Sequence, residues 1–298
     1  MVLIKKEAIN FKPYLLHNIP QHLQVLFEKI RREHYGELYE QESDGKASLD
    51  DTLSEVLKSL RDRNETLTHL RYLWMTLILI LVVEPTLKYY QPKNLLPKHI
   101  INLIANCVMN IIKNSINNTK NDISEFSTEE LLKAISKNRN FYVEKEIANF
   151  QILDEAIDVF DNAIRVLNYN QSVAAILNIL DDCLEGYAIF PGSYGRRELF
   201  DWWLLDVVPA SYKLRPPQSF YVVEGLENKE EIRSRQSRLL NKISKEIRSY
   251  LPELILELKK HNNYIFPTAG KINGGSFKKS VKILDREYHS KSPQLVYS

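Results

Sequence analysis

Two clusters of carboxylates have a spacing that suits a divalent metal ion. They are Asp50-Asp51-Thr-Leu-Ser-Glu55 and Asp181-Asp182-Cys-Leu-Glu185. On a helix, residues i, i+1 and i+4 share one end of a face, so each cluster presents oxygen ligands of the kind that Mg²⁺ prefers. Mg²⁺ held in this way binds a diphosphate, which makes a magnesium-dependent prenyl-type transferase one hypothesis. The first cluster has a simpler explanation, because acidic residues after Ser48 fit the start of a capped helix.

Most other catalytic and cofactor motifs are missing from the sequence. None of the seven histidines has an acidic residue three positions before it, and there is no His-Glu-x-x-His. The glycine-rich motifs of phosphate and dinucleotide sites are absent, and so is Gly-x-Ser-x-Gly. Cys107 and Cys183 are too far apart in sequence to form a metal-binding or redox motif. We therefore expect no bound transition metal and no cofactor.

A short stretch near residue 200 has a second interpretation. Phe190-Pro-Gly-Ser-Tyr-Gly-Arg-Arg197, followed by Asp201 and Asp206, resembles the Gly-Ser turn and acidic strand of nucleotidyltransferases. The resemblance implies a turn that holds a triphosphate and carboxylates that bind two Mg²⁺ ions. It covers only this part of the 298 residues. The sequence departs from the family's alternating Asp-x-Asp pattern, because residue 204 is leucine.

Residues 187–226 are rich in aromatic side chains and hold nine of the 30 aromatic residues of the chain. Among them, Phe200, Trp202 and Trp203 cannot all point to one neighbouring layer from a single helix. Either the segment is a buried hinge between two layers, or one ring is exposed. Trp, Tyr and Arg dominate the binding energy of protein interfaces. The second alternative predicts a partner-binding surface made of Arg196, Arg197, Trp202 and Trp203.

The C-terminal part of the chain is basic. Residues 227–298 carry a net charge of +7, which leaves −5 for residues 1–226. A long amphipathic helix is predicted over residues 228–260, with a stripe of cations well off its apolar face. A solvated face explains such a stripe, but its spacing also suits successive phosphates of a nucleic acid backbone. The residues concerned are Arg235, Arg238, Lys242 and Lys245 in the helix, and Lys278 and Lys279 in the tail.

The elements that must position these residues are predicted to be helices. No glycine lies between Gly45 and Gly186, and no proline lies between Pro97 and Pro191. Such a scarcity of breakers leaves helices joined by polar turns. The apolar run 72–83 has twelve residues, whereas a bilayer span needs about 20, so we expect the central helix of a soluble core. Residues 186–190 and 219–223 fit two short strands.

The predicted fold is mainly all-α, in three parts. Residues 1–186 form an irregular helical bundle. Residues 187–260 add the aromatic-rich insert and a long amphipathic helix that packs on the bundle, and residues 261–298 form a basic flexible tail. Without a signal-peptide pattern or a disulfide framework, we expect a cytoplasmic protein.

Three functions remain open from the sequence. The leading hypothesis is a non-catalytic interaction or regulatory protein, which docks a partner protein through the aromatic insert while the basic helix attracts it. The alternative is a nucleic-acid-binding factor that uses the basic helix and tail. The second alternative is a magnesium-dependent transferase of the nucleotidyl or prenyl type.

Overall fold

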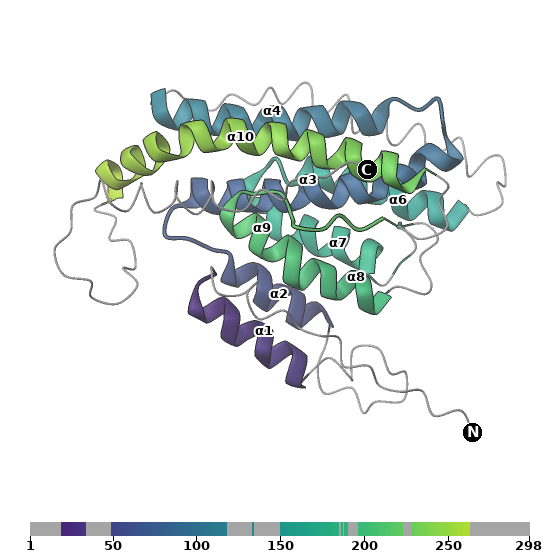
Figure 1. Cartoon of the computed structure of the whole chain (residues 1–298), viewed down its shortest axis with the longest axis horizontal. Helices are drawn as coiled ribbons and strands as arrows, with labels where there is room; N and C mark the ends of the chain where they lie inside the picture. The colour runs from purple at the N-terminus through teal and green to yellow at the C-terminus, as the bar shows by residue number, and fades with distance from the viewer. Residues whose placement is uncertain are drawn as a thin grey trace, which may run out of the picture. The chain divides into compact units, whose positions relative to one another are not determined.

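The computed structural model describes residues 19–33, 49–117, 133, 150–184, 186, 188–189, 196–222 and 228–262. Within them, helices and turns make up the structure and no strand is found, so the prediction of a mainly all-α fold is confirmed (Figure 1). The chain divides into two units, Met1–Leu258 and Lys259–Ser298. The helices are α1 (Gln21–Glu33), α2 (Leu49–Ser59), α3 (Glu65–Tyr90), α4 (Leu96–Asn117), α6 (Phe150–Arg165), α7 (Ser172–Leu184), α8 (Arg196–Trp202), α9 (Val208–Lys213) and α10 (Lys229–Asn262).

Helix α3 is the centre of the first unit. It is apolar on every side, and a helix of this kind must be covered on every side. It contacts α4, α6, α7 and α9, and its side chains from Thr68 to Glu84 are buried. Asn64 caps its first turn, since the side-chain oxygen accepts a hydrogen bond from the Leu67 N–H at 3.0 Å.

The length of α3 corrects the sequence-based argument about membranes. The apolar run predicts twelve residues, but the helix has 26, or about 39 Å. By length and composition α3 can therefore cross a bilayer. Its environment argues against such a span, because 83% of its most apolar window is buried among other helices. A 26-residue helix arises because Pro85 is accommodated inside it instead of ending it.

Helices α6 and α7 pack against each other and against α3. A short 3-10 turn, Tyr169–Gln171, joins them, and the Asn168 side chain caps it. Apolar residues that recur at helical spacing along α6 are buried, among them Ala156, Phe160 and Ala163. Burial of this kind of face is what holds helices of modest intrinsic stability in place.

Helices α8 and α9 form one continuous helical segment that contains a π turn, Trp203–Val207. Pro209 explains the turn. Proline has no N–H, and its ring collides with the carbonyl four residues earlier in a regular α-helix. The backbone widens instead, and the Val208 N–H donates to the Trp203 carbonyl, five residues back. The segment ends at Leu214, whose φ of 53° is left-handed.

The two short strands of the sequence prediction are not found in the described residues 186, 188–189 and 219–222. Ala188 donates its N–H to the Asp182 carbonyl at 3.2 Å, so the chain there closes the end of α7. The Ser219 carbonyl accepts a hydrogen bond from Trp202 Nε1 at 2.9 Å, and the Phe220 ring lies 6.2 Å from the indole of Trp202. Side-chain packing on helices thus replaces the pairing of strands.

Helix α10 covers α3 beside α4 (Figure 1). Its inward face is fully buried at Leu240, Ile247 and Leu254. Lys113 of α4 links the two helices, with its ammonium group 3.7 Å from the Glu246 carboxylate. The predicted long amphipathic helix is therefore present, and it packs on the bundle through the face that the sequence indicates.

Candidate functional site

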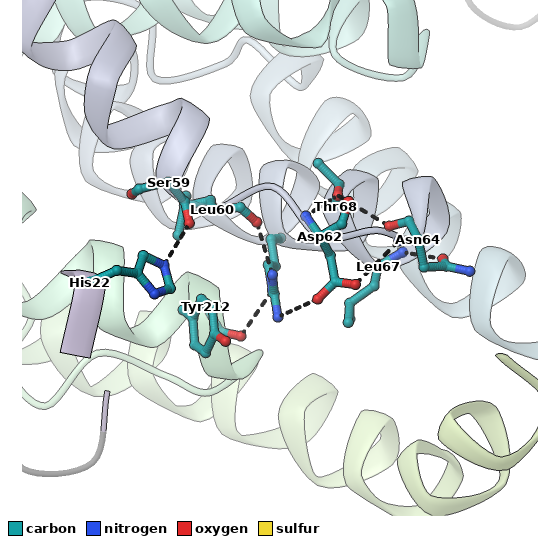
Figure 2. Close-up of polar contacts among 9 residues, drawn as sticks. His22, Ser59, Leu60, Asp62, Asn64, Leu67, Thr68 and Tyr212 are labelled. Carbon is teal, nitrogen blue, oxygen red and sulfur yellow. Dashed lines mark hydrogen bonds and ion pairs between the residues drawn. The ribbon is translucent and has the colours of Figure 1, made fainter. Parts of the chain in front are cut away.

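The described part of the chain contains a buried arginine, Arg71, whose three guanidinium nitrogens each have a polar partner. The guanidinium of Arg71 donates to the carbonyls of Leu60 at 2.9 Å and Tyr212 at 3.2 Å, and lies 3.4 Å from the Asp62 carboxylate. Its central carbon is 4.0 Å from the centre of the Tyr212 ring. Figure 2 shows Leu60, Asp62 and Tyr212 converging on this position. Arg71 therefore fastens the end of α2 and the end of α9 to α3, which is a structural task.

A second buried polar cluster fastens α10 to α3. Pro85 has no N–H, so the Leu81 carbonyl lacks its partner within α3. The side-chain amide of Gln236 donates to this carbonyl from α10. Next to it, the Glu84 carboxylate binds Arg235 of α10 and Lys88 of α3, at 2.8 and 2.9 Å. We call Glu84, Pro85, Arg235 and Gln236 the α3–α10 lock.

The two tryptophans of the predicted docking surface are buried. Trp202 and Trp203 are 7% and 0% exposed, and Phe200 is also buried. The buried hinge between two layers, the other alternative drawn from the sequence, matches these positions. Trp202 packs on the 219–221 segment, whereas Trp203 lies 5.7 Å from Phe200, between ring centres. The side chains of Arg196 and Arg197 lie outside the described residues.

The carboxylates do not assemble into a metal site in the described residues, where no three His, Cys, Asp or Glu side chains come together. Asp50 and Asp51 occupy the first turn of α2, as the capping explanation predicts. The nucleotidyltransferase resemblance implies that Asp201 and Asp206 lie on a strand. This expectation is wrong, because Asp201 lies on α8 and Asp206 lies on the π turn. Burial raises the pKa of Asp206, although hydrogen bonds from Ser219 lower it in part.

Both cysteines and His69 are buried in the described structure. Burial raises the pKa of the Cys107 thiol to about 12 and raises that of Cys183 strongly, which disfavours the nucleophilic thiolate. Burial also lowers the pKa of His69, whose Nε2 is 2.9 Å from the Val166 carbonyl. A neutral imidazole that donates to this carbonyl fits the site. Cys107, Cys183 and His69 therefore belong to the packed core.

The cationic stripe of α10 is the predicted set that the structure does bring together on the surface. Arg235, Arg238, Lys242 and Lys245 are all exposed and lie along one side of the helix. Arg235 is held by Glu84, so it is shared with the α3–α10 lock. We call the other three the α10 cation row: Arg238, Lys242 and Lys245. Lys278 and Lys279 lie outside the described residues.

No described carboxylate forms an ion pair with the α10 cation row. The nearest acidic residue along the helix, Glu246, is turned to Lys113 on α4. From Ile232 to Lys245, α10 contains five basic residues and no acidic one. Like charges at helical spacing repel one another. The row is therefore a local concentration of positive charge that an anionic partner would relieve.

Sequence reasoning missed the two buried polar clusters. Arg71 and Glu84 look like ordinary flanks of an apolar helix, and only the tertiary fold reveals their partners. One signal was present, however. A proline inside an apolar helix leaves a carbonyl unsatisfied, and a buried glutamine on a neighbouring amphipathic helix is a suitable donor.

Comparison with known proteins adds no relative. No family model matches this chain, no curated protein matches it, and no solved structure matches its fold. Any function must therefore be inferred from the arrangement of the residues themselves.

Proposed function

We propose that this protein is a binding protein that docks the phosphate backbone of a nucleic acid on the α10 cation row. The observation that carries the proposal is the exposure of Arg238, Lys242 and Lys245 on one side of a helix, without carboxylate partners among the described residues. The proposal retains a regulatory, non-catalytic role and changes the expected partner from a protein to a polyanion.

The dimensions of the row support this partner. Arg238 and Lys245 are seven residues apart, which is about 10 Å along a helix. Duplex DNA carries one negative charge per about 1.7 Å of its axis, so several phosphates lie within reach of the row. Helix α10 is also fixed to the bundle by the α3–α10 lock, and cations on a fixed element lose less conformational freedom on binding.

A protein partner bound through Trp202 and Trp203 is less well supported. Both indoles are buried, and Trp202 donates a hydrogen bond to the Ser219 carbonyl. Their use as docking groups requires the 196–222 segment to leave the core. Such a change uncovers two of the largest side chains of the fold, and burial of such a side chain contributes about 1.5–3 kcal/mol.

The test is the salt dependence of binding, measured by fluorescence anisotropy with labelled DNA and RNA of mixed sequence. Three phosphate contacts predict that the affinity falls about 20- to 40-fold between about 50 and 200 mM salt. The triple variant Arg238→Gln, Lys242→Gln, Lys245→Gln should lose most of this dependence and bind more weakly at low salt.

A charge-matched control separates this face from general attraction. Lys58→Gln, Arg63→Gln, Lys93→Gln also removes one arginine and two lysines, all from exposed positions on other elements. The control should keep both the affinity and the salt dependence of the unmodified protein. The proposal fails if the unmodified protein does not bind at low salt, or if the control loses as much as the α10 variant.

A further inference from the structure

A row of exposed amides runs along α4. Asn102, Asn106 and Asn110 recur every four residues, and all three are exposed. No hydrogen bond joins their side chains to other described residues. Four residues of helix rise about 6 Å, so the row presents three amide groups at regular intervals over about 12 Å. We call these three residues the α4 amide row.

The α4 amide row and the α10 cation row border the same seam. Lys113 of α4 crosses the seam to Glu246 at 3.7 Å, and its ammonium lies 5.8 Å from the centre of the Tyr250 ring. At about 100° per residue, the three amides lie within about 60° of the direction of Lys113. The three cations lie within about 100° of the direction of Glu246, away from the buried face.

The two rows also lie at the same level along the seam. Near its C-terminal end, which leads into the start of α4, α3 contacts Arg235 and Gln236 of α10. Near its own C-terminal end, α4 contacts Glu246 of α10. The two helices therefore run in the same direction (Figure 1). Counting back from the pair of Lys113 and Glu246 places Asn106 level with Leu239, next to Arg238, and Asn110 level with Ile243, between Lys242 and Lys245.

We propose that the seam between α4 and α10 binds single-stranded nucleic acid, with phosphates on the α10 cation row and base edges on the α4 amide row. The inference rests on the proposed function and names its substrate more narrowly. A base and its phosphate extend to opposite sides of the sugar, so a strand along the seam faces both rows at once.

The width of the surface favours a single strand over a duplex. One helix is about 10–12 Å wide and fills the major groove of DNA, which is about 12 Å wide. Two adjacent helices are too wide to enter together, so the α4 amides cannot reach the base edges of a duplex whose phosphates rest on α10. In a single strand the base edges are open to side chains.

The chemistry of the amide row selects the base. An asparagine side chain offers one acceptor and two donors, and it pairs with the N6 and N7 atoms of adenine through two hydrogen bonds. The seam therefore prefers adenine-rich strands. Three such contacts at a solvated surface lead us to expect about tenfold tighter binding of an adenine strand than of a cytosine or thymine strand.

The experiment uses the full chain and labelled 12-nucleotide strands of oligo-dA, oligo-dC and oligo-dT, with a mixed 12-base-pair duplex. The variant Asn102→Ala, Asn106→Ala, Asn110→Ala tests the amide row, and Gln21→Ala, Asn170→Ala, Gln171→Ala removes three exposed amides from other elements. Alanine is the better helix former, so these variants should fold. Circular dichroism and the thermal midpoint verify this.

The expected result is a separation of two effects. The amide-row variant should bring the affinities for the three strands to within about twofold of one another and keep a salt slope of about −2, the value for three phosphates on a single strand. The α10 triple variant should lose the salt slope and weaken all three strands alike. The control should behave as the unmodified protein.

Each negative result of this experiment contradicts a different part of the proposal. An unmodified protein that binds no strand at low salt contradicts the proposed function itself. Binding that is equal for all three strands, or as tight for the duplex, overturns the inference about the seam and leaves phosphate docking on α10 in place. Loss of binding through self-association, detected by sedimentation, overturns both, because a second copy then occupies the row.

Discussion

Arg71 and Arg238 carry the same guanidinium group in opposite surroundings. Arg71 lies in the core of the described structure, where two carbonyls, a carboxylate and an aromatic ring surround it. Arg238 lies on the outer side of α10 among other cations. This difference shows that polar side chains have two roles in this fold. Buried polar groups that find partners on neighbouring elements fasten the helices together, and exposed groups without a partner among the described residues are available to a ligand.

Among the changes that test this comparison, replacement of Arg71 should cause the largest loss of unfolding free energy. In Arg71→Met, the Leu60 and Tyr212 carbonyls lose their guanidinium donor and the Asp62 carboxylate loses its cationic partner, while all three remain largely buried. Removing one partner of a buried ion pair costs about 3–5 kcal/mol of unfolding free energy. Urea denaturation followed by circular dichroism measures the change.

The matched control is Arg238→Met, which removes the same group from the surface and should change stability by less than about 0.5 kcal/mol. Equal losses in the two variants would show that burial does not distinguish the two arginines.

The α3–α10 lock should give the next largest effect. Gln236→Leu leaves the Leu81 carbonyl buried without a donor, which costs about 1–3 kcal/mol. In Pro85→Ala the backbone regains the N–H that serves this carbonyl, so the same Gln236→Leu change should cost less there. A double-mutant cycle of denaturation free energies measures this coupling. Additive effects at the two positions would disprove the link between the proline and the glutamine.

The pH dependence of stability tests the buried His69. Burial lowers its pKa in the folded state, so below the ordinary value of about 6.5 the unfolded chain binds a proton that the native protein does not. The contribution of His69 is complete above that value and is lost as the pH falls through it. The urea concentration at the unfolding midpoint should therefore decrease as the pH is lowered from about 7.5 to about 5.5, and it should decrease less in His69→Gln.

His99→Gln, at an exposed position, is the control for the general loss of an imidazole. If it flattens the pH dependence as much as His69→Gln does, burial of His69 is not the cause.

The smallest effect on stability is expected at the cation row. Lys242→Gln with Lys245→Gln changes two exposed side chains for one of similar helix propensity. The thermal midpoint should stay within the shift that about 0.5 kcal/mol produces. If the midpoint rises clearly, the repulsion within the row is stronger than its exposure implies, and the drive to bind an anion is correspondingly larger.

The helices could be predicted from the sequence because their causes are local. Long stretches without glycine or proline, the acidic start of α2 and the apolar face of α10 depend on neighbouring residues alone. The extent of α3 was underestimated for a tertiary reason. Pro85 reads as the end of a helix until Gln236, far away in sequence, supplies a donor for the Leu81 carbonyl.

The candidate site was predictable in part. The stripe of α10 follows from helical periodicity, and the structure places its members on the surface as expected for either a solvated face or a docking face. The position of Trp202 and Trp203 could not be decided from the sequence, because a π turn at Pro209 changes which side of the segment each residue occupies. The seam with α4 depends on which helices are neighbours.

The α3–α10 lock sets a condition on how this chain folds during its synthesis. The carbonyl of Leu81 emerges from the ribosome early, but its donor follows 155 residues later. Until α10 is released, the central helix has a polar gap and an uncovered apolar side. The nascent bundle therefore cannot reach its final stability before nearly the whole chain has been translated.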